Sequence, residues 1–251
     1  MISLVSTFRR IMVLALGLAL CLAFAPLRAE AASSAAGLYL KLGFLDSIMT
    51  TGTIHSDLSV GNESMPFGTG SYTQNTMGGA FAIGYDFWQL NSVPVRAELE
   101  YAIRSNMNKT WNESEEVEDE VAKGSFNANW HLQTILANVY YDFRNSSPFT
   151  PYVGAGVGMG LLRTQYKFDF DYAGYASSDS VTQWDAVFAY NIGAGAYYNF
   201  NDNLAVDLGY RFLGTTYNKV NLDVVGGAAG QLKTGTALYS HDIMLSLRYT
   251  F

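Results

Sequence analysis

The chain repeats one pattern eight times: apolar side chains occupy every second position, and small or polar side chains lie between them. Period two is the spacing of a β-strand, in which successive side chains point to opposite faces. The segments lie near 37–45, 78–88, 93–104, 131–143, 149–162, 186–200, 204–213 and 239–251. The segment near 93–104 is the clearest, because apolar residues at 95, 97 and 99 alternate with Arg96 and Glu98. The pattern predicts an all-β chain.

The composition of the two faces distinguishes a membrane barrel from a soluble β-sandwich or lipocalin-like barrel, which also alternates. A soluble barrel points its apolar face inward. In the segment near 149–162, four alternate glycines would then leave almost no outer face. As a lumen face, small residues make room for long Arg and Glu side chains from neighbouring strands, and the apolar face contacts lipid. We therefore favour the membrane barrel.

The connector lengths support this interpretation. Short links at 89–92, 144–148 and 201–203 follow the second, fourth and sixth segments, and links of roughly 23 to 33 residues follow the others. Short periplasmic turns and long external loops are typical of outer-membrane barrels. We predict an eight-stranded antiparallel transmembrane β-barrel with short periplasmic turns and four long extracellular loops, located in the cell outer membrane.

Aromatic residues gather at the ends of these segments, where a membrane surface favours Tyr and Trp. They predict two girdles. The girdle beside the short links comprises Phe87, Trp88, Tyr141, Phe143, Phe149, Tyr152, Tyr198, Phe200, Tyr249 and Phe251. The external girdle comprises Phe44, Tyr101, Phe188, Tyr190, Phe212 and Tyr239.

Residues 1–31 have the features of a cleaved export signal, which leaves 32–251 as the barrel domain. Arg9 and Arg10 precede an apolar run, and the small residues Ala29 and Ala31 follow it at the positions that a signal peptidase reads. A transmembrane anchor is the alternative, but the run is short for one. Removal of 1–31 leaves 12 basic and 21 acidic residues and no Cys, which excludes disulfides, thiolate metal sites and a Cys nucleophile.

Three stretches resemble a known group. They are 136–143 (LANVYYDF), 148–160 (PFTPYVGAGVGMG) and the final 247–251 (LRYTF). Together they resemble the small outer-membrane β-barrel superfamily, which includes OmpA-type transmembrane domains, Opa-type opacity proteins and rickettsial-type surface antigens. The resemblance implies that Tyr249 and Phe251 form the terminal signal that the barrel-assembly machinery reads. It says little about activity, because such barrels host many functions.

The predicted lumen face carries five basic and six acidic residues, which must pair in a narrow barrel because an isolated buried charge is costly. They are Lys41, Asp86, Arg96, Glu98, Glu100, Arg104, Asp142, Asp207, Arg211, Asp242 and Arg248. We favour a salt-bridged plug, because eight strands leave room only for their own side chains. A narrow gated path for ions or small solutes stays open as the alternative.

Other chemistry is less well supported. The acidic stretch 113–120 lacks the spacing of a Ca²⁺ loop and is expected to be solvated rather than a metal site. His241 lies beside Ser240 and Asp242, but neighbouring strand residues point to opposite faces, so no triad is expected. Trp111, Trp130 and Trp184 are expected at loops or strand starts, as interfacial anchors or partner contacts. We expect no enzyme activity and no cofactor.

The expected partners follow from the predicted location. Outer-membrane lipid and lipopolysaccharide surround the barrel, the barrel-assembly machinery inserts it, and its loops face host cells, phage or neighbouring cells. The net charge of −7 argues against nucleic acid, which requires clustered Lys and Arg. A structural or adhesive surface barrel is the main functional hypothesis, and a small porin-like channel is the alternative.

Overall fold

A computed structural model describes residues 37–251 except 61–62, 67–69, 118–119, 173–174 and 227. The predicted signal segment lies outside the described residues. Nine labelled strands of the described chain form one antiparallel sheet. The sheet is closed, because β1 joins β4 to β13 and the β5–β7 pairing joins the two ends of the strand order. Strands β5 and β6 both pair with β7 and share one position, so the wall has eight positions, as predicted. The wall consists of β1 (Leu38–Thr51), β4 (Thr73–Asp86), β5 (Val95–Arg104), β6 (Met107–Val117), β7 (Glu120–Asp142), β8 (Phe149–Tyr172), β9 (Tyr175–Asn199), β10 (Leu204–Thr215) and β13 (Leu238–Thr250).

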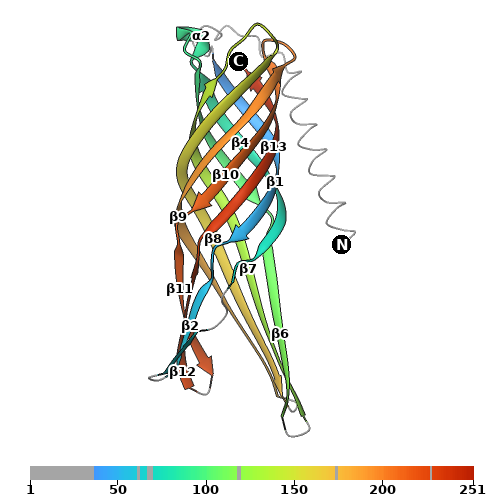
Figure 1. The fold of residues 1–251 in the computed structure, drawn as a ribbon, viewed down its shortest axis with the longest axis vertical. Helices are drawn as coiled ribbons and strands as arrows, with labels where there is room; N and C mark the ends of the chain where they lie inside the picture. The colour runs from blue at the N-terminus through green and yellow to red at the C-terminus, as the bar shows by residue number, and fades with distance from the viewer. Residues whose placement is uncertain (1–36, 61–62, 67–69, 118–119, 173–174, 227) are drawn as a thin grey trace.

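The two ends of the barrel differ (Figure 1). The short-turn end carries the three short links, including the single-turn helix α2 (Trp88–Asn91). At the opposite end, which we call the hairpin end, the predicted long loops are largely β structure that continues outward from the wall. The strands β7, β8 and β9 are therefore 23 to 25 residues long, well beyond the length predicted from the sequence.

Two arms extend from the hairpin end and diverge from each other (Figure 1). The β2–β12 arm is a separate four-stranded sheet of order β11-β12-β2-β3. The β6–β9 arm is the outward continuation of the wall through β6, β7, β8 and β9. The strands of the first arm are β2 (His55–Val60), β3 (Glu63–Pro66), β11 (Asn218–Gly226) and β12 (Ala228–Thr236).

The outer wall is apolar next to the short-turn end. Leu99, Ile192 and Leu208 point outward there, and each is more than half exposed to the surroundings. Large exposed apolar surfaces on all sides of a barrel belong in lipid rather than water. The strands that run toward the short-turn end each finish with an outward Tyr-x-Phe pair in edge-to-face contact, at 5.0 to 5.3 Å between ring centroids. These pairs are Tyr85–Phe87, Tyr141–Phe143, Tyr198–Phe200 and Tyr249–Phe251.

One predicted girdle residue is misplaced. Tyr152 points into the lumen, where it is buried and its hydroxyl donates to Asp207 Oδ1 at 2.7 Å. The other residues around it explain why: glycines at 195 and 209 leave the space that the ring fills, since a Cβ at either position would meet the Tyr152 hydroxyl at 2.5 to 2.7 Å. Glycines at 84, 154, 195 and 209 thus make room for tyrosine rings, and Gly193 lies against Arg211, whereas the sequence had suggested Arg and Glu chains throughout.

No helix in the described part of the chain is long and apolar enough to cross a bilayer.

Candidate functional site: the charged lumen and its apolar cover

The lumen next to the short-turn end is built around Arg96, which β5 points inward and which is fully buried. Its Nε donates to both carboxylate oxygens of Asp142, at 2.9 and 3.0 Å. Its guanidinium carbon lies 4.8 to 5.9 Å from the ring centroids of four tyrosines, which provide cation–π contacts in a site closed to water. The rings are Tyr39, Tyr140, Tyr152 and Tyr197.

A second group of charges centres on Lys41 of β1. Its Nζ lies 2.8 Å from Glu98 Oε1 and 3.9 Å from Asp207 Oδ2. The tyrosine hydroxyls complete the group, because Tyr39 and Tyr140 both donate to Glu98, at 3.1 and 3.3 Å. The Glu98 carboxylate therefore has three donors, which offset the cost of removing it from water.

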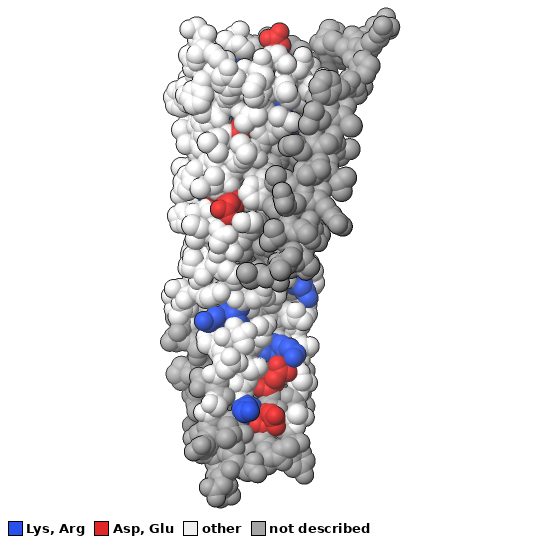
Figure 2. Space-filling model, turned by 90° about the vertical axis from the view of Figure 1, so that its right-hand side faces the viewer, with Lys and Arg blue, Asp and Glu red and all other residues white. Residues whose placement is uncertain are grey.

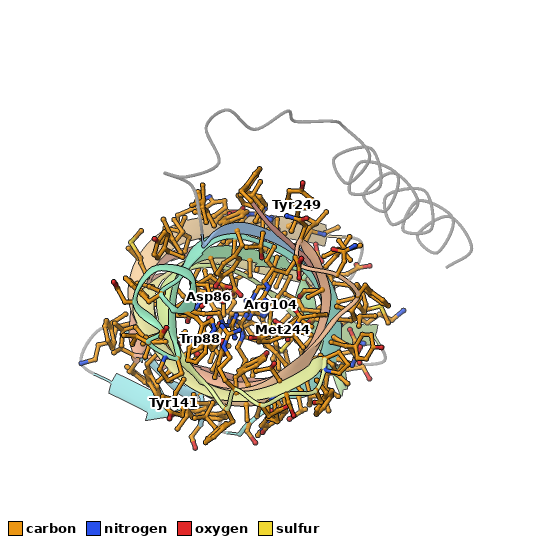
Figure 3. The ribbon with its side chains drawn as sticks, turned by 90° about the horizontal axis from the view of Figure 1, so that it is seen from above. Asp86, Trp88, Arg104, Tyr141, Met244 and Tyr249 are labelled. Atoms are coloured by element: carbon orange, nitrogen blue, oxygen red, sulfur yellow. The ribbon has the colours of Figure 1, made fainter. Side chains whose placement is uncertain are left out.

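Farther from the short-turn end, Arg211 of β10 joins two acids from different strands. Its guanidinium bonds to Glu100 and, through Nε at 2.8 Å, to Asp242 Oδ2. Arg104 Nη2 lies 2.6 Å from the same Asp242 oxygen. Arg211 and Glu100 are 111 positions apart in sequence, and Arg104 and Asp242 are 138 positions apart. These two pairs therefore link distant strands across the lumen. In Figure 3, which looks along the barrel, Asp86, Arg104 and Met244 lie inside the ring of strands, and Tyr141 and Tyr249 lie outside it.

Arg144, in the turn after β7, is a lumen cation that the sequence analysis missed. Its Nη2 lies 2.5 Å from Asp86 Oδ2 and 3.0 Å from Asp142 Oδ2, and its guanidinium carbon lies 5.5 Å from the Trp88 ring centroid. With Arg144, the described lumen holds six basic and six acidic side chains and is electrically balanced. The surplus of one acid in the predicted set was the available signal for a further cation.

Among the described residues, no carboxylate forms an ion pair with Arg248 of β13. Its guanidinium carbon lies 4.0 Å from the Tyr197 ring centroid and 5.4 Å from that of Tyr39. The structure thus places all eleven predicted lumen residues inside the barrel and buries them, and it adds the tyrosines that connect them. Among the eleven, Asp86 is paired with Arg144, and Arg248 contacts aromatic rings.

An apolar cluster fills the lumen toward the hairpin end, which the sequence analysis did not predict. Its members are inward residues from the strands of the wall and are almost fully buried. Trp130 belongs to it and is a core side chain. The prediction that Trp130 lies at the start of a strand is wrong, because β7 begins ten residues earlier, at Glu120. We call this set the apolar layer: Met49, Met107, Ala128, Trp130, Leu132, Leu136, Leu162, Tyr166, Ala189, Leu213 and Leu238.

The comparisons with known proteins agree with this architecture. The outer membrane protein beta-barrel domain family matches residues 17–251 of the chain. The chain belongs to this family. It is located in the outer membrane, with the short-turn end at the periplasm and the arms outside the cell.

Two relatives and one solved structure are similar to this chain. The outer membrane protein PagN of Salmonella typhimurium is 28% identical over 228 residues, which cover 88% of this chain and 92% of PagN. A putative adhesin of Rickettsia bellii is 27% identical over 121 residues, or 47% of this chain and 53% of the adhesin. The crystal structure of OprG from Pseudomonas aeruginosa is 14% identical, covers 86% of this chain and 96% of OprG, and has a TM-score of 0.48.

A cavity of about 20 Å³ lies between Lys41, Asp207 and Arg211, and Tyr152 and Asn191 line it. A single water needs about 10–15 Å³ of such volume, so the cavity fits one water and no hydrated ion. Charged groups line this cavity, and the apolar layer lies between it and the hairpin end.

His241 points outward and hydrogen-bonds through Nδ1 with the Tyr210 hydroxyl at 2.8 Å, whereas Ser240 and Asp242 are buried in the lumen. Ser240 Oγ donates to Asp242 Oδ1 inside the lumen, and His241 does not reach either of them, as the alternation predicted. Trp111 stacks on Phe126 in the β6–β9 arm, and Trp184 is 56% exposed on β9. The side chains of most of the acidic stretch 113–120, the metal candidate, lie outside the described residues.

Proposed function

We propose that the protein is a closed surface barrel whose two arms bind partners on host cells, phage or neighbouring cells. The observation that carries the proposal is the filled lumen: a balanced set of twelve charged side chains lies beneath an apolar layer, and the cavity between them fits one water. A barrel without a solute path presents its chemistry through its exposed parts. Relatives named as adhesins support the same assignment.

The arms suit a binding role because they are built as sheets. Paired β-strands hold side chains in fixed positions at low entropic cost, which favours specific contacts. In the β6–β9 arm, Trp111, Phe126 and Tyr166 stack in a row, with ring centroids 5.3 and 5.5 Å apart, which stiffens the base of the arm. The outer membrane lipid surrounds the wall, and we propose lipopolysaccharide as the lipid that contacts its outer half.

A test exchanges each arm for a short turn without touching the barrel. One variant replaces 112–124 and 168–179 of the β6–β9 arm, each with a two-residue turn, and the other replaces 222–232 and 58–65 of the β2–β12 arm in the same way. We expect normal heat-modifiable mobility for both, and loss of attachment of expressing bacteria to cultured cells for at least one. Unchanged attachment with both arms shortened, together with steady conductance of the intact barrel in planar bilayers, would support the channel alternative instead.

The proposal assigns no reaction to the barrel. His241 has an aromatic partner, Tyr210, and it packs against Phe212 at 5.4 Å between ring centroids. A nucleophile is needed beside it for hydrolysis of a lipid ester, and the two neighbouring polar residues face the lumen. Lipopolysaccharide deacylation by the wild-type barrel that His241→Ala abolishes would refute this part.

We also propose that Tyr249 and Phe251 form the assembly signal. They are the last of the four Tyr-x-Phe pairs, and the Phe251 amide closes the barrel by donating to the Leu38 carbonyl at 2.9 Å. Deletion of Phe251 should lower the amount of assembled barrel, and deletion of Phe200 serves as the internal control with an intact terminus. Equal yields for the two deletions would show that the terminal pair carries no special signal.

A further inference from the structure

The basic side chains of the described chain divide into two sets. One set fills the lumen, and the other lies outside it, toward the hairpin end. Arg163 of β8 begins the second set: it faces outward, two positions beyond Leu161, the last apolar residue of the outer face of that strand. Between the short-turn end and Arg163, the outward positions of β8 carry no charge. Figure 2 shows the same division on one side of the molecule, where blue side chains gather toward the hairpin end.

Arg163 differs in its partners from the lumen arginines, of which Arg248 is held by tyrosine rings. Arg96, Arg104, Arg144 and Arg211 are paired with carboxylates. Arg163 Nη2 donates to the neutral amide of Gln165 at 3.3 Å, and none of the ion pairs among the described residues includes it. Its positive charge is therefore available to an external anion.

The neighbours of Arg163 on the adjoining strands suit a membrane surface. Trp184 of β9 is its cross-strand partner on one side, and His131 of β7 is its partner on the other. Paired side chains on one face of a sheet lie about 5 Å apart at their Cβ atoms, so the three groups form one patch. Trp184 is 56% exposed, and a Trp at the edge of an apolar wall favours the headgroup region.

Below the patch lies the lipid-facing wall. The outward residues under Arg163 and Trp184 are Leu161 and Ala186, followed by Met159 and Phe188, which pair across β8 and β9. Acyl chains cover this surface, so the headgroups that they carry reach the height of Arg163. A guanidinium binds phosphate oxygens with two parallel N–H bonds, and it does so more strongly where water is partly excluded.

We propose that Arg163, with His131 and Trp184, binds a phosphate group of an outer-leaflet glycolipid and fixes the height and rotation of the barrel in the membrane. Lys167, four residues farther out on the same face, is already paired with Asp169 at 2.8 Å and contributes less. This role is separate from partner binding by the arms and depends only on the outer-membrane location.

The test measures lipid retention by the full-length mature barrel in phosphatidylcholine nanodiscs doped with diphosphoryl lipid A. The variants are Arg163→Gln, Arg163→Lys and the control Lys123→Gln. Lys123 is an exposed cation on the outward face of β7, eight residues beyond His131 and thus about 26 Å farther from the patch. Mass spectrometry of the purified complexes counts the bound lipid A, and heat-modifiable mobility shows that each variant is folded.

We expect Arg163→Gln to reduce retention about fivefold, the effect of one cation at a charged membrane surface. Arg163→Lys should keep part of the retention, and Lys123→Gln should match the wild type. Dephosphorylated lipid A should be retained poorly by every form. The proposal would be overturned if Arg163→Gln and Lys123→Gln retained equal amounts of lipid A. It would also be overturned if the wild type retained dephosphorylated and diphosphoryl lipid A equally. Complete displacement by inorganic phosphate at the concentration of lipid A would assign the site to a free anion instead.

Discussion

The lumen half next to the short-turn end is filled by ion pairs and tyrosine rings, whereas the half next to the hairpin end is filled by aliphatic and aromatic side chains. The outer face changes in the opposite sense. Along β7 the outward residues Val139 and Ile135 give way to Gln133 and Asn129, while the inward residues change from Asp142 to Leu132. The alternation along the strand keeps its period of two, but the apolar side chains move from the outer face to the inner face.

This exchange follows from the solvent on the outer side. Where lipid surrounds the wall, apolar side chains must face out, and the polar residues left inside have to satisfy one another. Beyond the membrane, water surrounds the wall, so the apolar face turns inward and the barrel continues as a soluble β structure does. Arg163 on the outer face of β8 and Leu162 on its inner face mark the height of the change.

Removal of a carboxylate from the ionic half should have the largest effect. Asp142→Ala leaves Arg96 and Arg144 without their shared partner, and breaking a buried pair costs about 3–5 kcal/mol. Urea unfolding of the barrel in lipid vesicles, followed by tryptophan fluorescence, measures the loss. Asp202→Ala in an exposed turn is the control and should be nearly silent. Similar unfolding midpoints for the two variants would contradict the pairing.

The apolar half can be tested with two adjacent leucines. Leu162→Ala creates a cavity in the apolar layer and should cost about 2–5 kcal/mol. Leu161→Ala removes the same atoms from the outward face, where lipid fills the space, and should cost about 1 kcal/mol or less. The same unfolding assay compares them. An equal or larger loss for Leu161→Ala would show that the inner side of this height is not packed as a core.

Arginine scanning sharpens the comparison from the outside. Leu99→Arg puts a charge on the lipid-facing wall and should cost about 2–4 kcal/mol near the bilayer midplane. Ser178→Arg, at an exposed position in the β6–β9 arm, should change the free energy of unfolding by about 0.5 kcal/mol or less. If both substitutions behaved alike, the position of the membrane on the wall would be wrong.

The sequence predicted the half of each strand that lies in lipid, because lipid imposes the same alternation on all eight segments. The structure buries all eleven predicted lumen charges inside the barrel. The sequence analysis missed the outward continuation of β7, β8 and β9, because the apolar residues there move to the other face and the first alternation ends. Leu132, Leu162 and Tyr166 carry the shifted alternation and were the available signal. Arg144 was missed because a turn residue has no strand phase to show that it points inward.

The smallest effect is expected from opening the ionic half alone. The double variant Lys41→Met with Glu98→Gln removes a charge pair, yet the apolar layer still closes the lumen above it. Its single-channel conductance in planar bilayers should therefore equal that of the wild type. Adding Leu132→Ala and Leu162→Ala opens the apolar layer as well, and steady conductance steps should then appear. Conductance in the double variant would mean that the ion pairs alone seal the barrel. Absence of conductance in the fourfold variant would mean that the tyrosine rings, which lie between the remaining charges, are enough to seal it.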